Sequence, residues 1–301
     1  MLDRKVIVVA LVLSLAPLAA CSAASSTAAS QPSLAATPSA SVTMDMGSPA
    51  AIASRSSAPG KRLPPVNAVF DYQIGGAYPP SEGVGIVTRD RGDSPVPGRY
   101  NICYVNAFQT QPAENSWWKN NHDDLLLKRN GAYVEDPNWP GELILDLSSG
   151  PKRAAIASIV DEWFKGCAGK GFQAIEPDNL DSWTRSQGLL TQADAIAFST
   201  LLTGRAHARG LVIGQKNTPE LGRAGKNAGY DFAIAEECAV YDECGDYIAV
   251  YGDNVIEIEY SDNPVSHYDR ACASHGKRIS VILRDRDVVA VGKPGYRYQN
   301  C

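Results

Sequence analysis

Short apolar runs alternate with longer stretches of helical pattern over most of the chain. Eight of these runs have the length and composition of strands. They are residues 68–74, 100–106, 142–147, 172–177, 211–216, 232–237, 255–260 and 278–284. Strands that alternate with helices predict a parallel sheet, and eight strands within about 240 residues predict a closed (β/α)8 barrel.

Two intervals between the strands show the helical pattern most clearly. Residues 154–167 place apolar side chains three and four positions apart, as expected for one buried face of a helix. Residues 191–209 begin at Thr191, a good N-cap, with Asp194 at the capping-box position, and Gly210 follows their end. We therefore expect a long helix in each interval.

The N-terminal segment has the pattern of an export signal. Asp3-Arg4-Lys5 precedes an apolar stretch, residues 6–20, that has the length of a signal-peptide core and is short for a membrane span. The stretch ends Leu18-Ala19-Ala20-Cys21, which resembles a bacterial lipobox, where the peptide is cut before a cysteine that is then lipidated. We predict a lipoprotein signal peptide at residues 1–20 and lipidation of Cys21. Ordinary secretion, with Cys21 incidental, is the alternative.

The segment after the signal differs sharply in composition from the rest of the chain. Residues 21–62 are rich in Ala, Ser, Thr and Pro and nearly free of aromatic side chains. Such a segment cannot bury enough apolar surface to offset the entropy lost on ordering, so we predict a disordered spacer. Residues 63–301 have the length of one barrel domain, which the spacer would hold away from a membrane or wall. We expect this domain to be a monomer.

The net charge restricts which molecules the protein can bind, and the number of cysteines indicates the redox compartment in which it folds. The formal net charge is -5, and mild acidity argues against nucleic acid as a partner. Of the 7 cysteines, six remain if Cys21 carries lipid, and an even number in an exported domain suggests disulfides. Six cysteines allow 15 pairings, of which we favour Cys103–Cys167, Cys238–Cys244 and Cys272–Cys301. The second pair would close a short loop, and the third would tie down the C-terminus.

Zinc binding is the alternative use of these cysteines. The chain has no Cys-x-x-Cys pair, and its four histidines are scattered over the sequence. Neither feature suits a tetrahedral zinc site. We therefore expect no bound metal and no cofactor.

Polar side chains end every predicted strand. The ends read Asp71-Tyr72-Gln73, Tyr104-Val105-Asn106, Asp146, Glu176-Pro177-Asp178-Asn179, Gln215-Lys216-Asn217, Glu236-Glu237, Glu257-Ile258-Glu259-Tyr260 and Arg284-Asp285-Arg286-Asp287. In a barrel of parallel strands these ends meet on one face, where barrel enzymes have their active sites. Aromatic rings stack on sugar rings, and carboxylates and amides bind hydroxyl groups. One such end alone is equally the start of a solvated loop, but eight together favour a carbohydrate site.

These strand ends resemble those of glycoside hydrolase family 114, the endo-α-1,4-polygalactosaminidase-like proteins. The resemblance covers residues 70–287 and rests on residues 71–76, 101–105, 171–181, 215–217, 235–238, 241–244 and 259–260. It implies a (β/α)8 barrel that cleaves α-1,4-linked galactosamine-containing polymers within the chain. It also implies a catalytic pair on strands four and six, which in this sequence are Asp178 and Glu236. The sequence differs from the residues common in the family at Ala235, Glu237 and Arg284. These differences bear on which substrate is bound more than on the identity of the catalytic pair.

The chemistry of glycoside hydrolysis assigns roles to these side chains. It needs a proton donor for the leaving oxygen and a second carboxylate that attacks the sugar or activates water. We assign Asp178 as nucleophile or base and Glu236 as general acid/base. The residues expected to bind substrate are Asp71, Gln73, Tyr104, Asn106, Glu176, Asn179, Lys216, Asn217, Glu259 and Tyr260. Lys216 is expected to pair with the carboxylates, and Glu237 to point away toward a basic group, since it alternates with Glu236 along the strand.

Two other functions fit parts of the pattern. A non-catalytic, cell-surface polysaccharide-binding lipoprotein could use the same barrel, although it would not need both Asp178 and Glu236. A metal-dependent hydrolase or deacetylase would need histidine ligands, yet the four histidines fall in predicted loops or helices. We therefore predict an exported enzyme that acts on an amino-sugar polymer. It would be anchored by lipid at the outer face of a bacterial cell membrane, or secreted.

Overall fold

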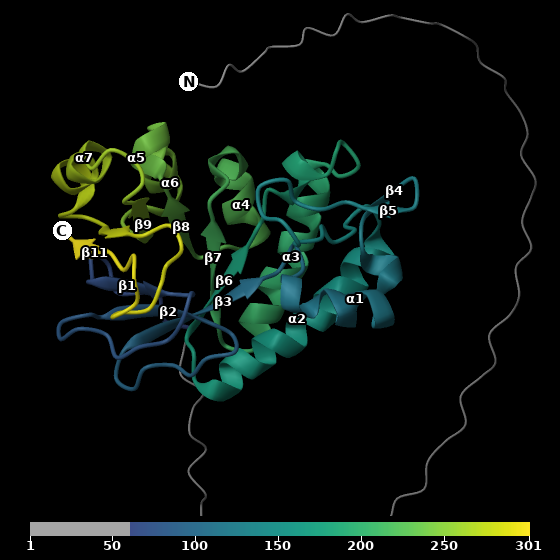
Figure 1. Ribbon diagram of the computed structural model, residues 1–301, viewed down its shortest axis with the longest axis horizontal. Coiled ribbons are helices and arrows are strands. Elements are labelled where there is room, and N and C mark those ends of the chain that lie inside the picture. The colour runs from purple at the N-terminus through teal and green to yellow at the C-terminus, as the bar shows by residue number, and fades with distance from the viewer. Residues whose placement is uncertain (1–60) are drawn as a thin grey trace, which may run out of the picture. The chain divides into compact units, whose positions relative to one another are not determined.

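Eight parallel strands form the centre of the computed structural model, which describes residues 61–301 (Figure 1). The strands lie side by side in the order in which they occur in the chain. They are β1 (Phe70–Gln73), β2 (Ile86–Asp90), β3 (Tyr100–Asn106), β6 (Ala174–Asp178), β7 (Val212–Lys216), β8 (Phe232–Glu236), β9 (Val255–Tyr260) and β10 (Ser280–Arg284). A ninth strand, β11 (Tyr298–Asn300), pairs antiparallel with β10. The predicted (β/α)8 barrel is confirmed.

Side chains close the seam between the first and the last parallel strands. Ser280 Oγ, on β10, donates a hydrogen bond to the carbonyl oxygen of Ala68, just before β1, at 2.6 Å. The Tyr298 hydroxyl, on β11, donates to the carbonyl oxygen of Phe70 at 2.9 Å. Both acceptors are backbone carbonyl groups at or just before β1. The two side chains therefore satisfy carbonyl groups that a neighbouring strand would otherwise pair.

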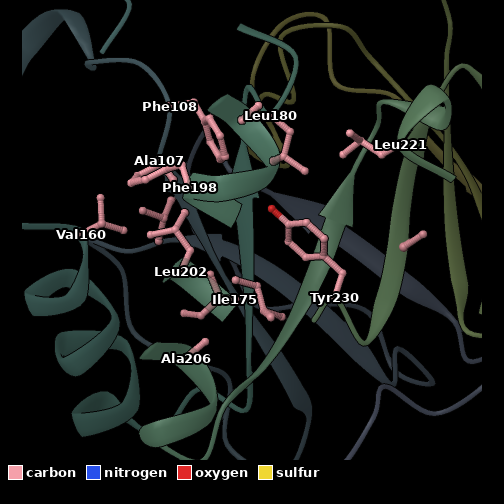
Figure 2. Packing of buried hydrophobic residues seen from close by; sticks show 14 of the residues in the cluster. Ala107, Phe108, Val160, Ile175, Leu180, Phe198, Leu202, Ala206, Leu221 and Tyr230 are labelled. Carbon is pink, nitrogen blue, oxygen red and sulfur yellow. The ribbon is translucent and has the colours of Figure 1, made fainter. Parts of the chain in front are cut away.

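Alternation along the strands separates the barrel interior from the helix-facing layer. On β8, Phe232 and Ile234 pack inside the barrel, whereas Ala233 and Ala235 face the outer layer. Figure 2 shows part of that outer layer, where the rings of Phe108 and Phe198 meet edge to face with centroids 4.9 Å apart. The strands are thus buried on both faces, as expected of a parallel sheet.

Helices follow most of the strands and cover the outside of the barrel. They are α1 (Asn115–Asn121), α2 (Gly150–Lys170), α3 (Gln192–Ala208), α4 (Gly222–Ala228), α5 (Cys238–Tyr241), α6 (Cys244–Tyr251) and α7 (Ser266–His275). A small hairpin, β4 (Lys128–Arg129) and β5 (Ala132–Tyr133), lies in the long connection between β3 and α2. Residues 74–85 and 91–99, which join the first three barrel strands, contain no helix.

The two long helices confirm the sequence prediction, and their ends follow local chemistry. The Thr191 hydroxyl oxygen accepts a hydrogen bond from the Asp194 amide, and the Asp194 carboxylate accepts one from the Thr191 amide, which completes a capping box for α3. At the start of α2 the Ser149 hydroxyl oxygen accepts a hydrogen bond from the Lys152 amide, which is a simple N-cap. Gly171 ends α2 at a φ of 98°, a left-handed conformation that glycine adopts without steric cost.

One predicted strand is wrong, and one strand of the barrel is missing from the prediction. Residues 142–147 do not join the barrel but make isolated antiparallel bridges, such as Leu126↔Leu145, within the β3–α2 connection. Their apolar side chains are buried there, so a strand-like pattern arises outside the barrel. The second place in the barrel belongs to β2, whose short sequence follows a loop rich in Gly and Pro. Because the two errors cancel, β6 and β8 are still the fourth and sixth strands.

Three disulfides join the pairs favoured from the sequence. Cys103–Cys167 links β3 to α2, Cys238–Cys244 links α5 to α6, and Cys272–Cys301 links α7 to the C-terminus. The first and third bonds close loops with sequence separations of 64 and 29 residues, so they constrain the unfolded chain most.

The predicted signal peptide, Cys21 and residues 22–60 of the predicted spacer lie outside the described residues. Within residues 61–301, none of the helices has the length and apolar character needed to cross a membrane.

Candidate active site

A cavity of about 460 Å³ opens at the carboxyl ends of the barrel strands. Its walls come from the ends of β3, β6, β8 and β9 and from loops beyond the strands. The lining residues are Ile74, Tyr104, Asn138, Trp139, Glu142, Asp178, Asn179, Asp181, Arg185, Asn217, Glu236, Glu237, Tyr241, Tyr260, Arg286 and Val288. This is the face on which barrel enzymes carry their active sites.

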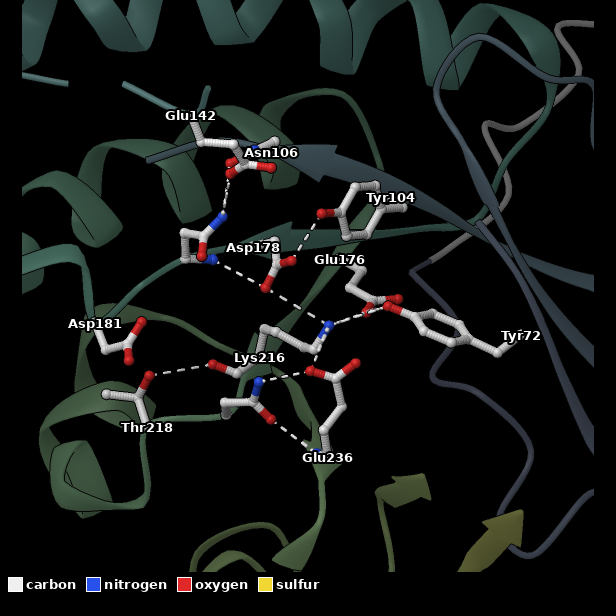
Figure 3. Close-up of polar contacts among 12 residues, drawn as sticks. Tyr72, Tyr104, Asn106, Glu142, Glu176, Asp178, Asp181, Lys216, Thr218 and Glu236 are labelled. Carbon is white, nitrogen blue, oxygen red and sulfur yellow. Dashed lines mark hydrogen bonds and ion pairs between the residues drawn. The ribbon is translucent and has the colours of Figure 1, made fainter. Parts of the chain in front are cut away.

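Asp178 and Glu236 face each other across the end of β7 (Figure 3). Asp178 ends β6, Glu236 ends β8, and Lys216 ends the strand between them. The ammonium nitrogen of Lys216 lies 3.5 Å from Asp178 Oδ1 and 3.4 Å from Glu236 Oε2. The two carboxylates therefore line one cavity and share one cation.

Asp178 is held in its ionised form. The Tyr104 hydroxyl donates to its Oδ2 at 2.7 Å, and the Asn179 amide donates to its Oδ1 at 2.9 Å. Burial acts to raise the pKa of Asp178, but the charge of Lys216 and these hydrogen bonds outweigh it and lower the pKa below its usual value. At neutral pH this side chain is a carboxylate.

Glu236 is fixed in orientation by its two neighbours in the cavity wall. Asn217 Nδ2 donates to Glu236 Oε2 at 2.9 Å, while Asn217 Oδ1 accepts from the Glu236 amide at 2.8 Å. The Tyr260 hydroxyl donates to Glu236 Oε1. Burial and the charge of Glu236 raise the pKa of Tyr260 well above its usual value, so this hydroxyl stays a donor.

Lys216 and Glu176 lie beneath the cavity rather than on its wall. Both are almost fully buried, and Lys216 Nζ lies 3.0 Å from Glu176 Oε1, which also accepts from the Tyr72 hydroxyl at 2.8 Å. Burial acts to lower the pKa of Lys216, but the charges of Asp178, Glu236 and Glu176 raise it well above its usual value. Lys216 therefore pairs with the carboxylates as expected and is not an uncharged amine. Glu176, predicted to bind substrate, acts on the cavity through Lys216.

Asp71 and Gln73 do not reach the cavity, contrary to the prediction. Tyr72 points into the barrel, so its two neighbours on β1 point outward. Gln73 Nε2 donates to Asp71 Oδ2 at 2.8 Å, and Asp71 Oδ1 accepts from the Tyr78 hydroxyl at 2.7 Å. Gln73 Oε1 accepts from Arg89 Nε at 2.9 Å. These two side chains brace the β1–β2 loop.

Glu259 also lies outside the cavity, and the reason is again strand alternation. Ile258 and Tyr260 face the barrel interior, so Glu259 points into the helix layer. It is buried, and its Oε1 accepts from the Ala239 amide at 2.9 Å. Glu259 therefore anchors the start of α5 and does not line the cavity.

Glu237 has the basic partner that was expected, but it lines the cavity instead of pointing away. Its carboxylate accepts from Arg286 at 2.6 and 2.8 Å and from Asn263 Nδ2 at 2.6 Å. The prediction of its direction assumed a continuing strand. The strand ends at Glu236, and Glu237 has a φ of 59°, so alternation no longer applies.

Loop residues complete the cavity, and these were missing from the prediction. Glu142 Oε2 accepts from Asn106 Nδ2 at 2.9 Å and from Asn179 Nδ2 at 3.4 Å. Asn106, predicted to bind substrate, thus supports Glu142 and Asn179 from below the wall. Burial raises the pKa of Glu142 to about 7. Trp139 and Tyr241 also line the cavity and are 55% and 62% exposed. Nothing in the hydrophobic pattern marks these positions, of which Tyr241 is the last residue of α5.

Within residues 61–301, one set of three potential metal ligands lies close together, namely Cys238, Cys244 and Glu257. Its two sulfurs are joined in a disulfide, so they are not available as thiolate ligands.

Comparisons with known proteins agree with this architecture. The model of glycoside-hydrolase family GH114 matches residues 50–301, whereas no curated protein matches the sequence. The structure of Aspergillus fumigatus Ega3 in complex with galactosamine is similar at 24% sequence identity and a TM-score of 0.65, covering 82% of this chain and 100% of that chain. The glycoside hydrolase domain of PelA from Pseudomonas aeruginosa is similar at 15% identity and a TM-score of 0.51, covering 75% and 96%. At these identities the two structures support the barrel fold.

Proposed function

Because the chain belongs to glycoside-hydrolase family GH114 and is a glycoside hydrolase, we propose that Asp178 and Glu236 are its two catalytic carboxylates. Glycoside hydrolysis needs one carboxyl group to protonate the leaving oxygen and another to attack the sugar or activate water. The observation that carries the proposal is that both carboxylates face one cavity from alternate strands and share Lys216. Family membership and the presence of both groups favour an enzyme over a non-catalytic binding protein.

The surroundings of the two groups suit different roles. Asp178 is the nucleophile or the base, because Lys216 and Tyr104 favour its ionised form. Glu236, on the other side of Lys216, then takes the remaining role of general acid/base, and Asn217 and Tyr260 hold its two oxygens in position. Lys216 positions both carboxylates from below and limits the charge repulsion between them.

We propose that the substrate is an α-1,4-linked galactosamine-containing polysaccharide, cleaved within the chain. The cavity is lined by five carboxylates and by two exposed aromatic rings, which suits a cationic sugar that stacks. The complex of Ega3 with galactosamine, a structure of the same fold, supports this choice.

Product analysis tests the proposed substrate. The full chain is incubated with a deacetylated α-1,4-galactosamine polymer, with its N-acetylated form and with an α-glucan. We expect the galactosamine polymer to give oligosaccharides of mixed length early in the reaction, as internal cleavage requires. Cleavage of the α-glucan alone, or release of single sugars from one end, would contradict the proposal.

We further propose that the protein is exported and acts as a monomer outside the cell. Three disulfides in the folded part support an oxidising compartment. Lipidation at Cys21 and a spacer over residues 21–62 would tether the catalytic domain, residues 63–301, to the outer face of a membrane.

A further inference from the structure

Glu142 is the carboxylate of the cavity wall that makes no ion pair within residues 61–301, although the charge of Arg185 acts on it from a longer distance. The other four each have a cationic partner: Asp178 and Glu236 have Lys216, Asp181 has Arg185, and Glu237 has Arg286. Glu142 makes no ion pair in this part of the chain. A half-buried carboxylate in such a position is a site that a ligand's charge can complete.

The hydrogen bonds of Glu142 go to one of its two oxygens only. Asn106 and Asn179 both donate to Oε2, and Asn179 Nδ2 also donates to Asn106 Oδ1 at 3.0 Å (Figure 3). Within the described residues Oε1 accepts no hydrogen bond. The amides therefore fix the direction of the carboxylate and leave Oε1 for a donor from outside the protein.

A tight turn joins Glu142 to Trp139, whose side chain is exposed. The Glu142 amide donates to the Trp139 carbonyl oxygen at 3.0 Å, with Pro140 and Gly141 between them. Gly141 has a φ of 92°, and Pro followed by a left-handed Gly is the signature of a type II turn. Trp139 and Glu142 thus lie three positions apart on one turn and both line the cavity.

We propose that this turn is a subsite that binds a sugar with a free amino group, with Glu142 Oε1 accepting from its ammonium and Trp139 stacking on its ring. Glu142 is then the residue that distinguishes a free amine from an N-acetyl group, which has no charge and more bulk. This inference rests on the proposed function of the cavity and deepens it by naming how the amino sugar is recognised.

An ammonium group suits Glu142 better than a metal ion does. Calcium needs six to eight oxygen ligands, whereas the two nearest polar neighbours of Glu142 turn N–H groups toward it. An ammonium needs only acceptors and can make its other bonds to water. Burial raises the pKa of Glu142 to about 7, although the charge of Arg185 acts to lower it, and a bound ammonium would lower it further.

Calorimetry with short oligosaccharides tests the subsite in the full-length protein. We compare wild type with Glu142→Gln, which keeps the shape and removes the charge, for a galactosamine oligosaccharide and its N-acetylated form. We expect Glu142→Gln to weaken binding of the galactosamine oligosaccharide about 10- to 100-fold, the value of one charge-assisted hydrogen bond. Binding of the N-acetylated form should change less than about twofold. At pH 7 wild type should also release more protons on binding than the variant.

Matched variants make the result decisive. Glu142→Asp keeps the charge and should retain part of the preference for the free amine, whereas Glu162→Gln, on the exposed face of α2, should change neither affinity. Equal losses for both oligosaccharides, or no loss for the amine, would overturn the proposal. Turnover is measured separately with wild type. If binding depends on Glu142 but no products form, the proposed hydrolysis is refuted and the subsite stands. If products form but binding does not depend on Glu142, the subsite is refuted and the proposed hydrolysis stands.

Discussion

Lys216 is the residue on which the geometry of the site depends most. It is 1% exposed at its side chain and contacts three carboxylates, those of Glu176, Asp178 and Glu236. Removing one partner of a buried ionic cluster lowers the free energy of unfolding by more than the intact cluster contributes to it, because the remaining charges stay buried without a counter-charge.

Lys216→Met should therefore lower the free energy of unfolding by about 3–5 kcal/mol, measured by denaturant unfolding. Lys165→Met is the control, because Lys165 pairs with Glu162 on the exposed face of α2 and the change should stay within about 0.5 kcal/mol. A Lys216→Met protein as stable as this control would show that Lys216 does not neutralise the buried acids.

The same residue-level view shows why part of the site could be predicted from the sequence. The strand pattern locates the strand ends, and with them residues such as Tyr104, Lys216 and Tyr260. Asp71 and Glu259 could not be separated from them, because both faces of these strands are buried and the hydrophobic pattern does not give the direction. Glu142 and the other loop residues depend on chain folding that no periodicity encodes.

At the scale of elements, seven of the eight predicted strands lie in the barrel, because each is a continuous apolar run followed by a polar end. The exception, residues 142–147, has the same pattern for another reason, since it is buried within an insertion. The β2 strand was harder to predict because helix-free connections flank it, so the expected strand-helix alternation is absent there.

Strand β9 carries a buried acid pair whose behaviour with pH follows from its surroundings. Glu257 is fully buried, and its Oε2 has no hydrogen-bond partner within the described residues. Burial and the charge of Glu259 raise the pKa of Glu257 to about 8, although Arg270 acts to lower it. The folded state thus holds this proton more tightly than the unfolded state does. The resulting stability is present below the unfolded pKa and is lost as the pH rises toward 8.

Glu257→Gln removes this titration. Its free energy of unfolding, relative to wild type, should increase between pH 5 and pH 8.5 by an amount on the order of a few kcal/mol. Denaturant unfolding at several pH values measures the difference. A difference that does not change with pH would mean that Glu257 titrates normally in the folded protein.

At the scale of the whole molecule, the proposed lipid anchor at Cys21 would determine where the enzyme works. Processing at Cys21 would give a mature chain that begins with a lipidated cysteine and partitions with membranes. Cys21→Ala should abolish lipid attachment and move the protein out of the membrane fraction, as seen by mass spectrometry and fractionation. A Cys21→Ala protein that is processed normally and stays with membranes would contradict the anchor.

The most direct test of the account is the activity of Asp178→Asn and Glu236→Gln on galactosamine polymer. Each change keeps the shape of the side chain and removes its charge or its proton. Loss of positioned proton transfer alone typically costs 10²–10⁴-fold, so kcat/KM should fall at least about 10²-fold in both variants. Thermal unfolding should show that both remain folded, and Glu162→Gln should keep full activity. Wild-type turnover by a folded Asp178→Asn protein would contradict the mechanism proposed for this cavity.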